Sequence, residues 1–331
     1  MPELYCDNFD VSLNVGYKKY TYPEGFFVNN PWSPVADFSG NARKDAVGFA
    51  IGDKGYTGTG RVSFYYSGTG TNIMEFNDFW EYDPALDQWT KKEDFPGGTR
   101  YFAAGFSIGE KGYVGTGFDN TSDDSHNDFW GFDPKQNTWS READFPGDPR
   151  RGAVGFSING KGYLGLGYHD MHGTVYHYEH DIWEYDPLSN TWTEIPSFEQ
   201  NIINPMVFVA NDKAYIVYGV KLWMFDPLDY TWEQKADYPG KSFEGIAFSI
   251  DNKGYVGTGD LGGDNYTNSF WEYDPLTDEW TKLSSHYLLY RDKAVGFSIN
   301  NIGYIGTGST GTLRGLDHYR HYKDFWKYIP E

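Results

Sequence analysis

A pair of tryptophans nine residues apart recurs along the whole chain and limits the folds open to it. Complete pairs occur at Trp80 and Trp89, Trp130 and Trp139, Trp183 and Trp192, Trp223 and Trp232, and Trp271 and Trp280. A sixth copy begins at Trp326, close to the last residue. Successive copies are 40 to 55 residues apart, a period typical of folds in which each unit packs against its neighbours.

Each unit has the pattern of four short strands. In the third copy, residues 153–158 (AVGFSI) and 162–167 (GYLGLG) read as two strands joined by a tight Asn-Gly turn. A variable loop leads to a third strand at 182–186 (IWEYD), and an Asp-Pro turn leads to a fourth that begins at Trp192. One such sheet cannot bury both faces alone, but six sheets arranged around an axis can. The sequence therefore predicts an all-β fold, a six-bladed β-propeller of four-stranded blades.

The two ends of the chain complete each other. The sixth copy stops after its third strand, at DFWKYIPE, and has no fourth strand. Residues 32–40 (WSPVADFSG) match residues 139–147 (WSREADFPG) in register. We therefore predict that a strand at 32–40 closes the ring, which leaves no open sheet edge. Residues 1–31 are then an N-terminal extension of unknown role, and residues 32–331 form one domain with blades that begin near residues 43, 100, 150, 202, 242 and 291.

These units resemble the kelch repeat. The resemblance rests on the glycine pair after the second strand, the Tyr-Asp-Pro step and the tryptophan before the fourth strand. The glycine pair departs from the adjacent Gly-Gly of that repeat, because this chain has Gly-Thr-Gly or Gly-Leu-Gly. The resemblance implies a propeller, and kelch propellers include partner-binding modules, sugar oxidases and a sialic-acid epimerase. The fold therefore leaves the function open.

Composition argues against several classes of function. The formal net charge is −20, so the phosphate backbone of a nucleic acid would be repelled. No stretch approaches the roughly 18 apolar residues of a membrane-spanning helix. Cys6 is the only cysteine, which rules out an intrachain disulfide. We expect an extracytoplasmic bacterial protein, at the cell surface or outer membrane, in the periplasm or secreted, whose signal peptide is absent from this chain.

Sequence variation is concentrated on one face of the predicted ring, where the loops between second and third strands emerge. The third of these loops contains four histidines. Neutral imidazoles suit Zn²⁺, so the candidate metal ligands are His169 with His172, or His177 with His180. Two other interpretations of the loop remain open. It can be a solvated loop, or a ligand-binding surface whose flat apolar side chains are Tyr168, Tyr176 and Tyr178.

The mouth of the central channel is the second candidate site. The first strand of every unit starts there, and the residue position just before it differs from unit to unit. The residues at this position that we predict to bind a ligand are Asp45, Phe102, Asn204, Glu244 and Lys293. His286, in the connection before the sixth unit, and Tyr319, in the sixth variable loop, are predicted to join them.

Two residues before this position, four units carry an arginine: Arg43, Arg100, Arg150 and Arg291. We expect these arginines to be structural and to bond with the acids that precede the third strands, which are Asp78, Asp128, Asp181 and Asp324. The other two units have Ile202 and Ser242 at the arginine position. The fourth unit also has almost no variable loop, only Gly219 and Val220.

Signs of enzyme chemistry are few. The chain contains no Gly-x-Ser-x-Gly, phosphate loop or His-Glu-x-x-His motif. A copper-dependent sugar oxidase would need a cysteine inside the blades, and Cys6 lies outside them. We predict a non-enzymatic module, without a cofactor, that binds a protein partner or a glycan on the variable-loop face. The alternative is a sugar-modifying enzyme of the sialic-acid epimerase or mutarotase kind, with Glu244 and either His286 or Arg291 as its acid/base pair.

Overall fold

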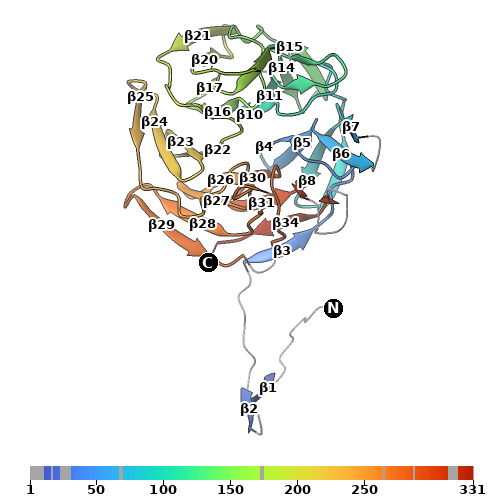
Figure 1. Ribbon diagram of the computed structural model, residues 1–331, viewed down its shortest axis with the longest axis vertical. Coiled ribbons are helices and arrows are strands. Elements are labelled where there is room, and N and C mark those ends of the chain that lie inside the picture. Colours follow the sequence, from blue (N-terminus) through green and yellow to red (C-terminus); the bar gives the residue numbers. More distant parts are fainter. Residues whose placement is uncertain are drawn as a thin grey trace.

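Six four-stranded antiparallel sheets stand in a ring around a central channel (Figure 1). The structure is a computed structural model, and it describes residues 11–15, 18–22, 31–66, 70–171, 175–263, 265–285, 288–311 and 320–330. These residues contain strands and turns but no helix, and so no helix long and apolar enough to cross a membrane. Within the predicted N-terminal extension, β1 (Val11–Val15) and β2 (Lys18–Tyr22) pair in a two-stranded sheet of their own.

Five blades are built from consecutive segments, and the strands of each follow one another from the channel outwards. Blade 1 contains β4 (Val47–Ile51), β5 (Lys54–Gly58), β8 (Phe79–Asp83) and β9 (Gln88–Lys91). Blade 2 contains β10 (Ala104–Ile108), β11 (Lys111–Gly115), β14 (Phe129–Asp133) and β15 (Thr138–Arg141). Blade 3 contains β16 (Val154–Ile158), β17 (Lys161–Gly165), β20 (Ile182–Asp186) and β21 (Thr191–Ile195). Blade 4 contains β22 (Met206–Ala210), β23 (Lys213–Tyr218), β24 (Lys221–Asp226) and β25 (Thr231–Gln234), and blade 5 contains β26 (Ile246–Ile250), β27 (Lys253–Gly257), β28 (Phe270–Asp274) and β29 (Glu279–Leu283).

Blade 6 joins the two ends of the chain. It contains β30 (Val295–Ile299), β31 (Ile302–Gly306), β34 (Phe325–Tyr328) and, as its outer strand, β3 (Trp32–Val35). Trp32 lies opposite Tyr328 in this pairing and is only 1% exposed. The predicted closure of the ring by an N-terminal strand is confirmed. The strand itself ends at Val35 rather than at the predicted residue 40, because the following residues turn toward blade 1.

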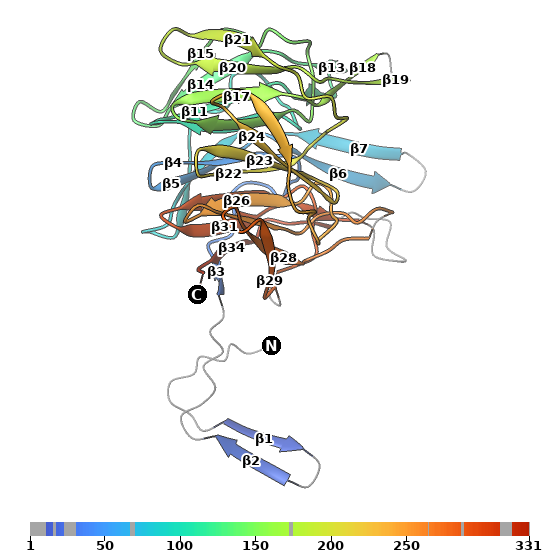
Figure 2. The same cartoon turned by 90° about the vertical axis from the view of Figure 1, so that its left-hand side faces the viewer.

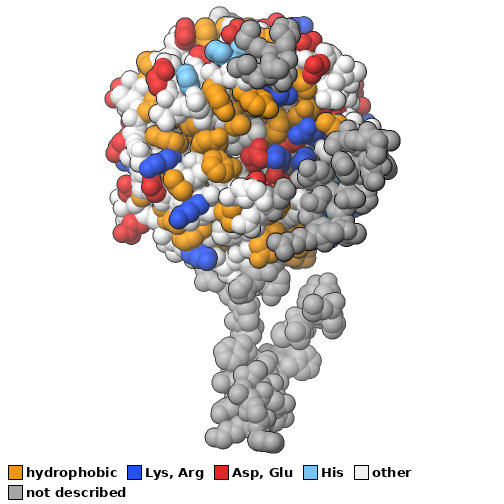
Figure 3. All heavy atoms as spheres, viewed as in Figure 1, with side chains coloured by type: hydrophobic (Ala, Val, Ile, Leu, Met, Phe, Trp, Pro, Cys, Tyr) orange, Lys and Arg blue, Asp and Glu red, His pale blue; other side chains and the backbone are white. Residues whose placement is uncertain are grey.

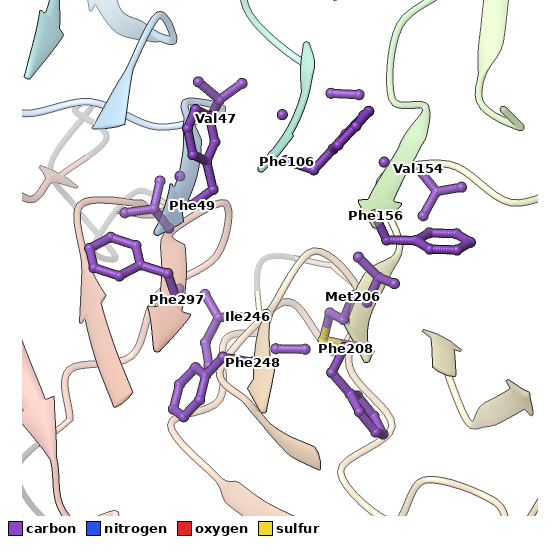
Figure 4. A pocket seen from close by; sticks show the side chains of 18 of the residues that line it. Val47, Phe49, Phe106, Val154, Phe156, Met206, Phe208, Ile246, Phe248 and Phe297 are labelled. Carbon is purple, nitrogen blue, oxygen red and sulfur yellow. The ribbon is translucent and has the colours of Figure 1, made fainter. Parts of the chain in front are cut away.

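The innermost strands line the channel with small side chains. In β4 the side chains of Val47, Phe49 and Ile51 are buried between blades, while Gly48 and Ala50 face the channel. The other inner strands alternate in the same way, as a period of two requires. Figure 4 shows the rings of Phe49 and its counterparts directed away from the channel, into the spaces between blades. The channel encloses about 450 Å³.

Glycine in the second strand lets neighbouring blades approach closely. A side chain at Gly112 of β11 would come within 2.4 Å of the ring of Phe49 in the preceding blade. Gly55, Gly162, Gly254 and Gly303 have the same relation to a phenylalanine of the blade before them. The recurrent Lys-Gly-Tyr or Ile-Gly-Tyr sequence is therefore a packing requirement between blades.

The four arginines are buried in matching ion-pair networks. In blade 2, the guanidinium of Arg100 donates hydrogen bonds of 2.6 and 3.1 Å to the two carboxylate oxygens of Asp128, and one of 3.0 Å to the carbonyl of Thr116. Trp130 Nε1 donates to the same carboxylate at 2.7 Å. The predicted pairs Arg43–Asp78, Arg100–Asp128, Arg150–Asp181 and Arg291–Asp324 are all present, and every one of these arginines is fully buried. Their role is structural, as predicted.

One face of the ring carries additional hairpins between the second and third strands. They are β6 (Arg61–Tyr66) with β7 (Gly70–Glu75), β12 (Phe118–Asp119) with β13 (Asp124–Ser125), β18 (Tyr168–Met171) with β19 (Val175–Tyr178), and β32 (Ser309–Thr310) with β33 (Arg320–His321). Figure 2 shows β6–β7 and β18–β19 extending from the same side of the ring. Blade 4 has only Gly219 and Val220 at this point. We call this side the loop face.

Candidate ligand-binding site

A ring of six residues surrounds the mouth of the channel on the loop face. All six adopt the left-handed backbone conformation, with φ between 45° and 65°: Asp45, Phe102, Gly152, Asn204, Glu244 and Lys293. Such angles are uncommon for residues other than glycine and often occur at functional sites. In five of the six, the backbone amide donates to the carbonyl of the ring residue in the preceding blade, for example Phe102 to Asp45 at 3.2 Å and Lys293 to Glu244 at 2.7 Å. Backbone hydrogen bonds therefore link most of the rim.

The five residues predicted from the sequence for this mouth lie together. They line a cavity of about 160 Å³ with small neighbours such as Ala46 and Ala103. Lys293 Nζ lies 2.7 Å from a carboxylate oxygen of Glu244 and 2.9 Å from one of Asp292. Asn204 Nδ2 donates to the other oxygen of Glu244 at 3.0 Å. Figure 3 shows acidic and basic side chains gathered at the centre of this face, with hydrophobic side chains around them.

Burial and charge act together on the ionisable groups of the mouth. Burial raises the pKa of Glu244 above its usual value, although the neighbouring Lys293 opposes this shift. Burial alone would lower the pKa of Lys293, but the carboxylates of Glu244, Asp45 and Asp292 outweigh it and raise this pKa. Lys293 is therefore protonated, and its ammonium group interacts with several carboxylates at once.

On one side of the mouth, arginine and aromatic side chains alternate. Arg61 Nε donates to Asp45 Oδ2 at 2.7 Å, and the Arg61 guanidinium lies 3.8 Å from the centre of the Tyr101 ring. Tyr101 packs edge-on against Phe118 at 5.6 Å, and Arg151 lies 4.1 Å from the centre of Phe118. Cations held over aromatic faces are attracted by the ring quadrupole. The aromatic rings and guanidinium groups therefore pack in alternation in a largely buried layer beside the mouth.

The alternating series ends at the third hairpin. Arg151 also lies 4.9 Å from the centre of the Tyr168 ring, and Tyr176 packs edge-on against Tyr168 at 5.3 Å. Tyr168 is buried while Tyr176 is exposed. Arg61, Tyr101, Phe118, Arg151, Tyr168 and Tyr176 together are called the aromatic–arginine arc below.

Four members of this arc were not predicted from the sequence: Arg61, Tyr101, Phe118 and Arg151. A signal for them exists in the repeat. The residue after the arginine position forms a backbone bridge with the residue after the glycine pair, as in Lys44 with Arg61, Tyr101 with Phe118 and Arg151 with Tyr168. Aligning the units at these two positions would have placed all of these side chains in a second ring around the first.

The third hairpin separates its histidines from its tyrosines. Because Tyr168 pairs with Tyr178 and His169 with His177, alternate residues of β18 and β19 lie on opposite sides of the hairpin. His169 Nδ1 lies 2.6 Å from a carboxylate oxygen of Glu179, and His177 Nδ1 lies 3.4 Å from the same oxygen. His180 does not join His177 as predicted, since its Nε2 is bonded to the side chain of Asn201 at 2.9 Å.

Other predicted site residues are placed differently or not described. His172, His286 and Tyr319 lie outside the described residues. Tyr178 is partly buried on the tyrosine side of the third hairpin. Arg291 cannot act as the acid/base partner of Glu244, because it is fully buried and bonded to Asp324 and the carbonyl of Thr307.

The fold and these repeats agree with the comparisons to known proteins. The family model described as the kelch motif matches residues 254–286, in blade 5. The solved structure of YjhT aligns with a TM-score of 0.69 over 88% of this chain and 96% of that chain, at 18% sequence identity. No curated protein matches the sequence. An identity of 18% carries the fold and not the function. The chain is a six-bladed β-propeller that carries a kelch motif in blade 5.

Proposed function

We propose that this propeller is a non-enzymatic binding module that recognises a glycan at the mouth of its loop face. The observation that carries the proposal is the position of the polar rim beside the aromatic–arginine arc. Lys293, Asn204 and Glu244 bond to one another at one small cavity, and the N–H groups and carboxylate lone pairs that these bonds do not use suit the hydroxyl groups of a sugar. The exposed ring of Tyr176 offers a flat apolar surface for the face of a sugar ring.

A carboxylate of the mouth also has capacity for a ligand. Asp45 accepts from Arg61 through Oδ2, whereas its buried Oδ1 has no hydrogen-bond partner within the described ranges. Buried acceptors are nearly always satisfied by protein or by ordered water. A ligand hydroxyl or a water that bridges to it would satisfy this oxygen.

A protein partner is the second candidate. It is favoured by the apolar side chains of the first hairpin, where Phe64 is 42% and Met74 is 53% exposed. Large exposed apolar side chains that flank a polar site are typical of protein-binding surfaces. A partner that docked on β6–β7 could insert a polar side chain or an attached glycan into the mouth.

Sugar-modifying activity is the remaining alternative. Glu244 is the acid/base candidate in the mouth, and burial raises its pKa toward the range useful for proton transfer. Its carboxylate is, however, engaged by Lys293 and Asn204, and its predicted partner Arg291 is bonded elsewhere. We therefore expect no change in the anomeric or epimeric composition of sugars that bind, when NMR spectra are followed with and without the protein. Turnover that a Glu244→Gln variant abolishes would support the enzyme instead.

The binding proposal is tested with loop-face and opposite-face variants of the same protein. A glycan array identifies the ligand, and calorimetry compares Tyr176→Ala with Tyr178→Ala, Arg151→Ala, and the controls Leu188→Ala and Leu276→Ala. The two leucines are 96% and 87% exposed in turns of the opposite face. Loop-face variants should bind at least about tenfold more weakly, roughly 1.4 kcal/mol, and the leucine variants should bind normally. If the leucine variants lose binding while the tyrosine and arginine variants keep it, the wrong face has been assigned.

The two partner classes separate in a further measurement. Phe64→Ser with Met74→Ser should leave binding of a free glycan within about twofold of normal, because neither side chain belongs to the rim of the mouth. A protein partner recovered by the normal chain but not by this double variant would identify the second candidate. Loss of free-glycan binding in the double variant would place the glycan on the first hairpin and overturn the proposed mouth site.

A further inference from the structure

We propose that His169, His177 and Glu179 form a Zn²⁺ site on the side of the third hairpin opposite Tyr168 and Tyr176. The register of β18 with β19 places the two histidines directly opposite each other, and Glu179 follows two residues after His177 on the same side. Residues with this spacing in paired strands present their side chains together. Two imidazoles and one carboxylate are a ligand set that zinc uses with an open fourth position.

The three side chains already converge on one point. Both Nδ1 atoms face the same carboxylate oxygen of Glu179, at 2.6 Å for His169 and 3.4 Å for His177. One ligand atom from each residue lies within 4.8 Å of the others. Ligand bonds of about 2.0–2.2 Å in a tetrahedron place the donor atoms roughly 3.4 Å apart. The cluster therefore needs only small side-chain rotations to enclose an ion.

His169 and Glu179 are largely enclosed by neighbouring residues, whereas His177 is mostly exposed. Glu179 is 13% and His169 is 22% exposed at the side chain, whereas His177 is 62% exposed. The amide of Glu179 donates to the carbonyl of Gly167 at 3.0 Å, and its carboxylate lies 3.8 Å from Arg150 beneath it. Arg150 is itself bonded to Asp181, so it orients the Glu179 carboxylate without consuming both of its oxygens. His177 can then close on the ion from the solvent side, with water in the fourth position.

The arrangement of the two imidazoles also favours a bound metal ion over direct histidine–glutamate contacts. The two rings lie 5.1 Å apart with an angle of 25° between them. One carboxylate oxygen facing two imidazole nitrogens can accept from both only if both carry a proton at Nδ1. A divalent cation among the three groups accepts a lone pair from each of them and removes this requirement. The site is independent of the proposed glycan function, because its residues lie on the opposite side of the hairpin from Tyr168 and Tyr176.

Zinc uptake by the full chain tests this site. The metal-free protein is titrated with Zn²⁺ by calorimetry and with Co²⁺ by visible absorption, with Mg²⁺ as the oxygen-preferring control. We expect a zinc site of one equivalent and a tetrahedral Co²⁺ spectrum. His177→Ala and His169→Ala should each weaken Zn²⁺ binding by more than about tenfold, the loss that removal of even an outer partner can cause.

The matched control is His180→Ala, which removes a histidine of the same loop that bonds to Asn201 and lies outside the cluster. This variant should bind Zn²⁺ normally. The highly exposed His177 is the variant that tests the site most safely, because its removal leaves the fold intact, as a melting curve will verify. No zinc uptake, or equal zinc affinity in the normal protein and both cluster variants, would overturn the proposal and leave a histidine–glutamate hydrogen bond. Loss of zinc binding in His180→Ala would overturn the assigned ligand set.

Discussion

The junction between blades 3 and 4 lacks a hydrogen bond that joins neighbouring blades at four other junctions. At four junctions, the backbone amide four residues after an outer-strand tryptophan donates to an Asp or Asn side chain of the next blade, as Ala143 does to Asn190 at 2.8 Å. The other three pairs are Ala36–Asp87, Glu93–Asn137 and Ala236–Asp278. At the junction of blades 3 and 4 the corresponding residues are Pro196, which has no amide hydrogen, and Tyr230, which has no carbonyl group in its side chain.

A second hydrogen bond is missing at the same junction. Elsewhere the outer tryptophan donates to a carbonyl of the preceding blade, as Trp192 does to Ala143 at 2.9 Å. Trp232 Nε1 in blade 4 is buried and has no such partner in the described part of the chain. Instead, Trp232 stacks on Phe198 with ring centres 4.2 Å apart, and Ile202 occupies the arginine position in the core. Equivalent junctions between blades are therefore stabilised either by hydrogen bonds or by apolar packing.

The largest expected loss of stability comes from breaking the arginine–aspartate network of blade 2. Asp128→Ala would leave the fully buried Arg100 without its carboxylate and Trp130 without its acceptor. Removing one partner of a buried ion pair costs about 3–5 kcal/mol of unfolding free energy. We expect the free energy of unfolding to fall by that amount, measured by chemical unfolding of the normal and variant proteins.

The double variant Arg100→Met with Asp128→Leu is the control for this prediction. It gives blade 2 an apolar residue at the arginine position, as blade 4 has with Ile202, and replaces the aspartate as well, where blade 4 has Lys221. Well-packed apolar side chains often replace a buried ion pair at little cost, so the double variant should recover most of the lost stability. A double variant as unstable as Asp128→Ala would show that blade 4 is not a valid precedent for blade 2.

The comparison also explains what could be predicted from the sequence. The repeat specified the blades, the closing strand and the arginine–aspartate pairs, because each depends on a position that recurs in several units. The meeting of His169 with His177 depends instead on the register of one hairpin that occurs once, and three-residue spacing in the sequence did not suggest this pair. The missing bonds of Pro196 and Trp232 are also specific to one junction. Features repeated around the ring were predictable, whereas pairings unique to one loop or junction were not.

A smaller effect is expected from restoring the polar pair at the junction of blades 3 and 4. Pro196→Ala supplies an amide hydrogen, and Tyr230→Asn supplies an acceptor at a position whose φ of 58° suits asparagine better than tyrosine. Tyr230→Asn also loses packing, since Tyr230 is partly buried against the core of this junction, whereas Pro196 is exposed. We expect the double variant to be more stable than the sum of the single effects by about 1 kcal/mol, the net value of one hydrogen bond. If the two single effects simply add in this double-mutant cycle, no hydrogen bond has formed between the two positions.

The smallest predicted effect concerns pH and again contrasts blade 2 with blade 4. His126, at the end of the hairpin β12–β13, has its pKa lowered by burial and by the nearby Arg100, and blade 4 has no such hairpin. Because its pKa is lower in the folded protein than the unfolded value near 6.5, protonation favours the unfolded state. The stability linked to His126 is therefore present above pH 6.5 and is lost as the pH falls below that value. A His126→Asn variant should lose less stability than the normal protein between pH 7 and pH 5, and identical pH profiles would show that His126 does not contribute to acid sensitivity.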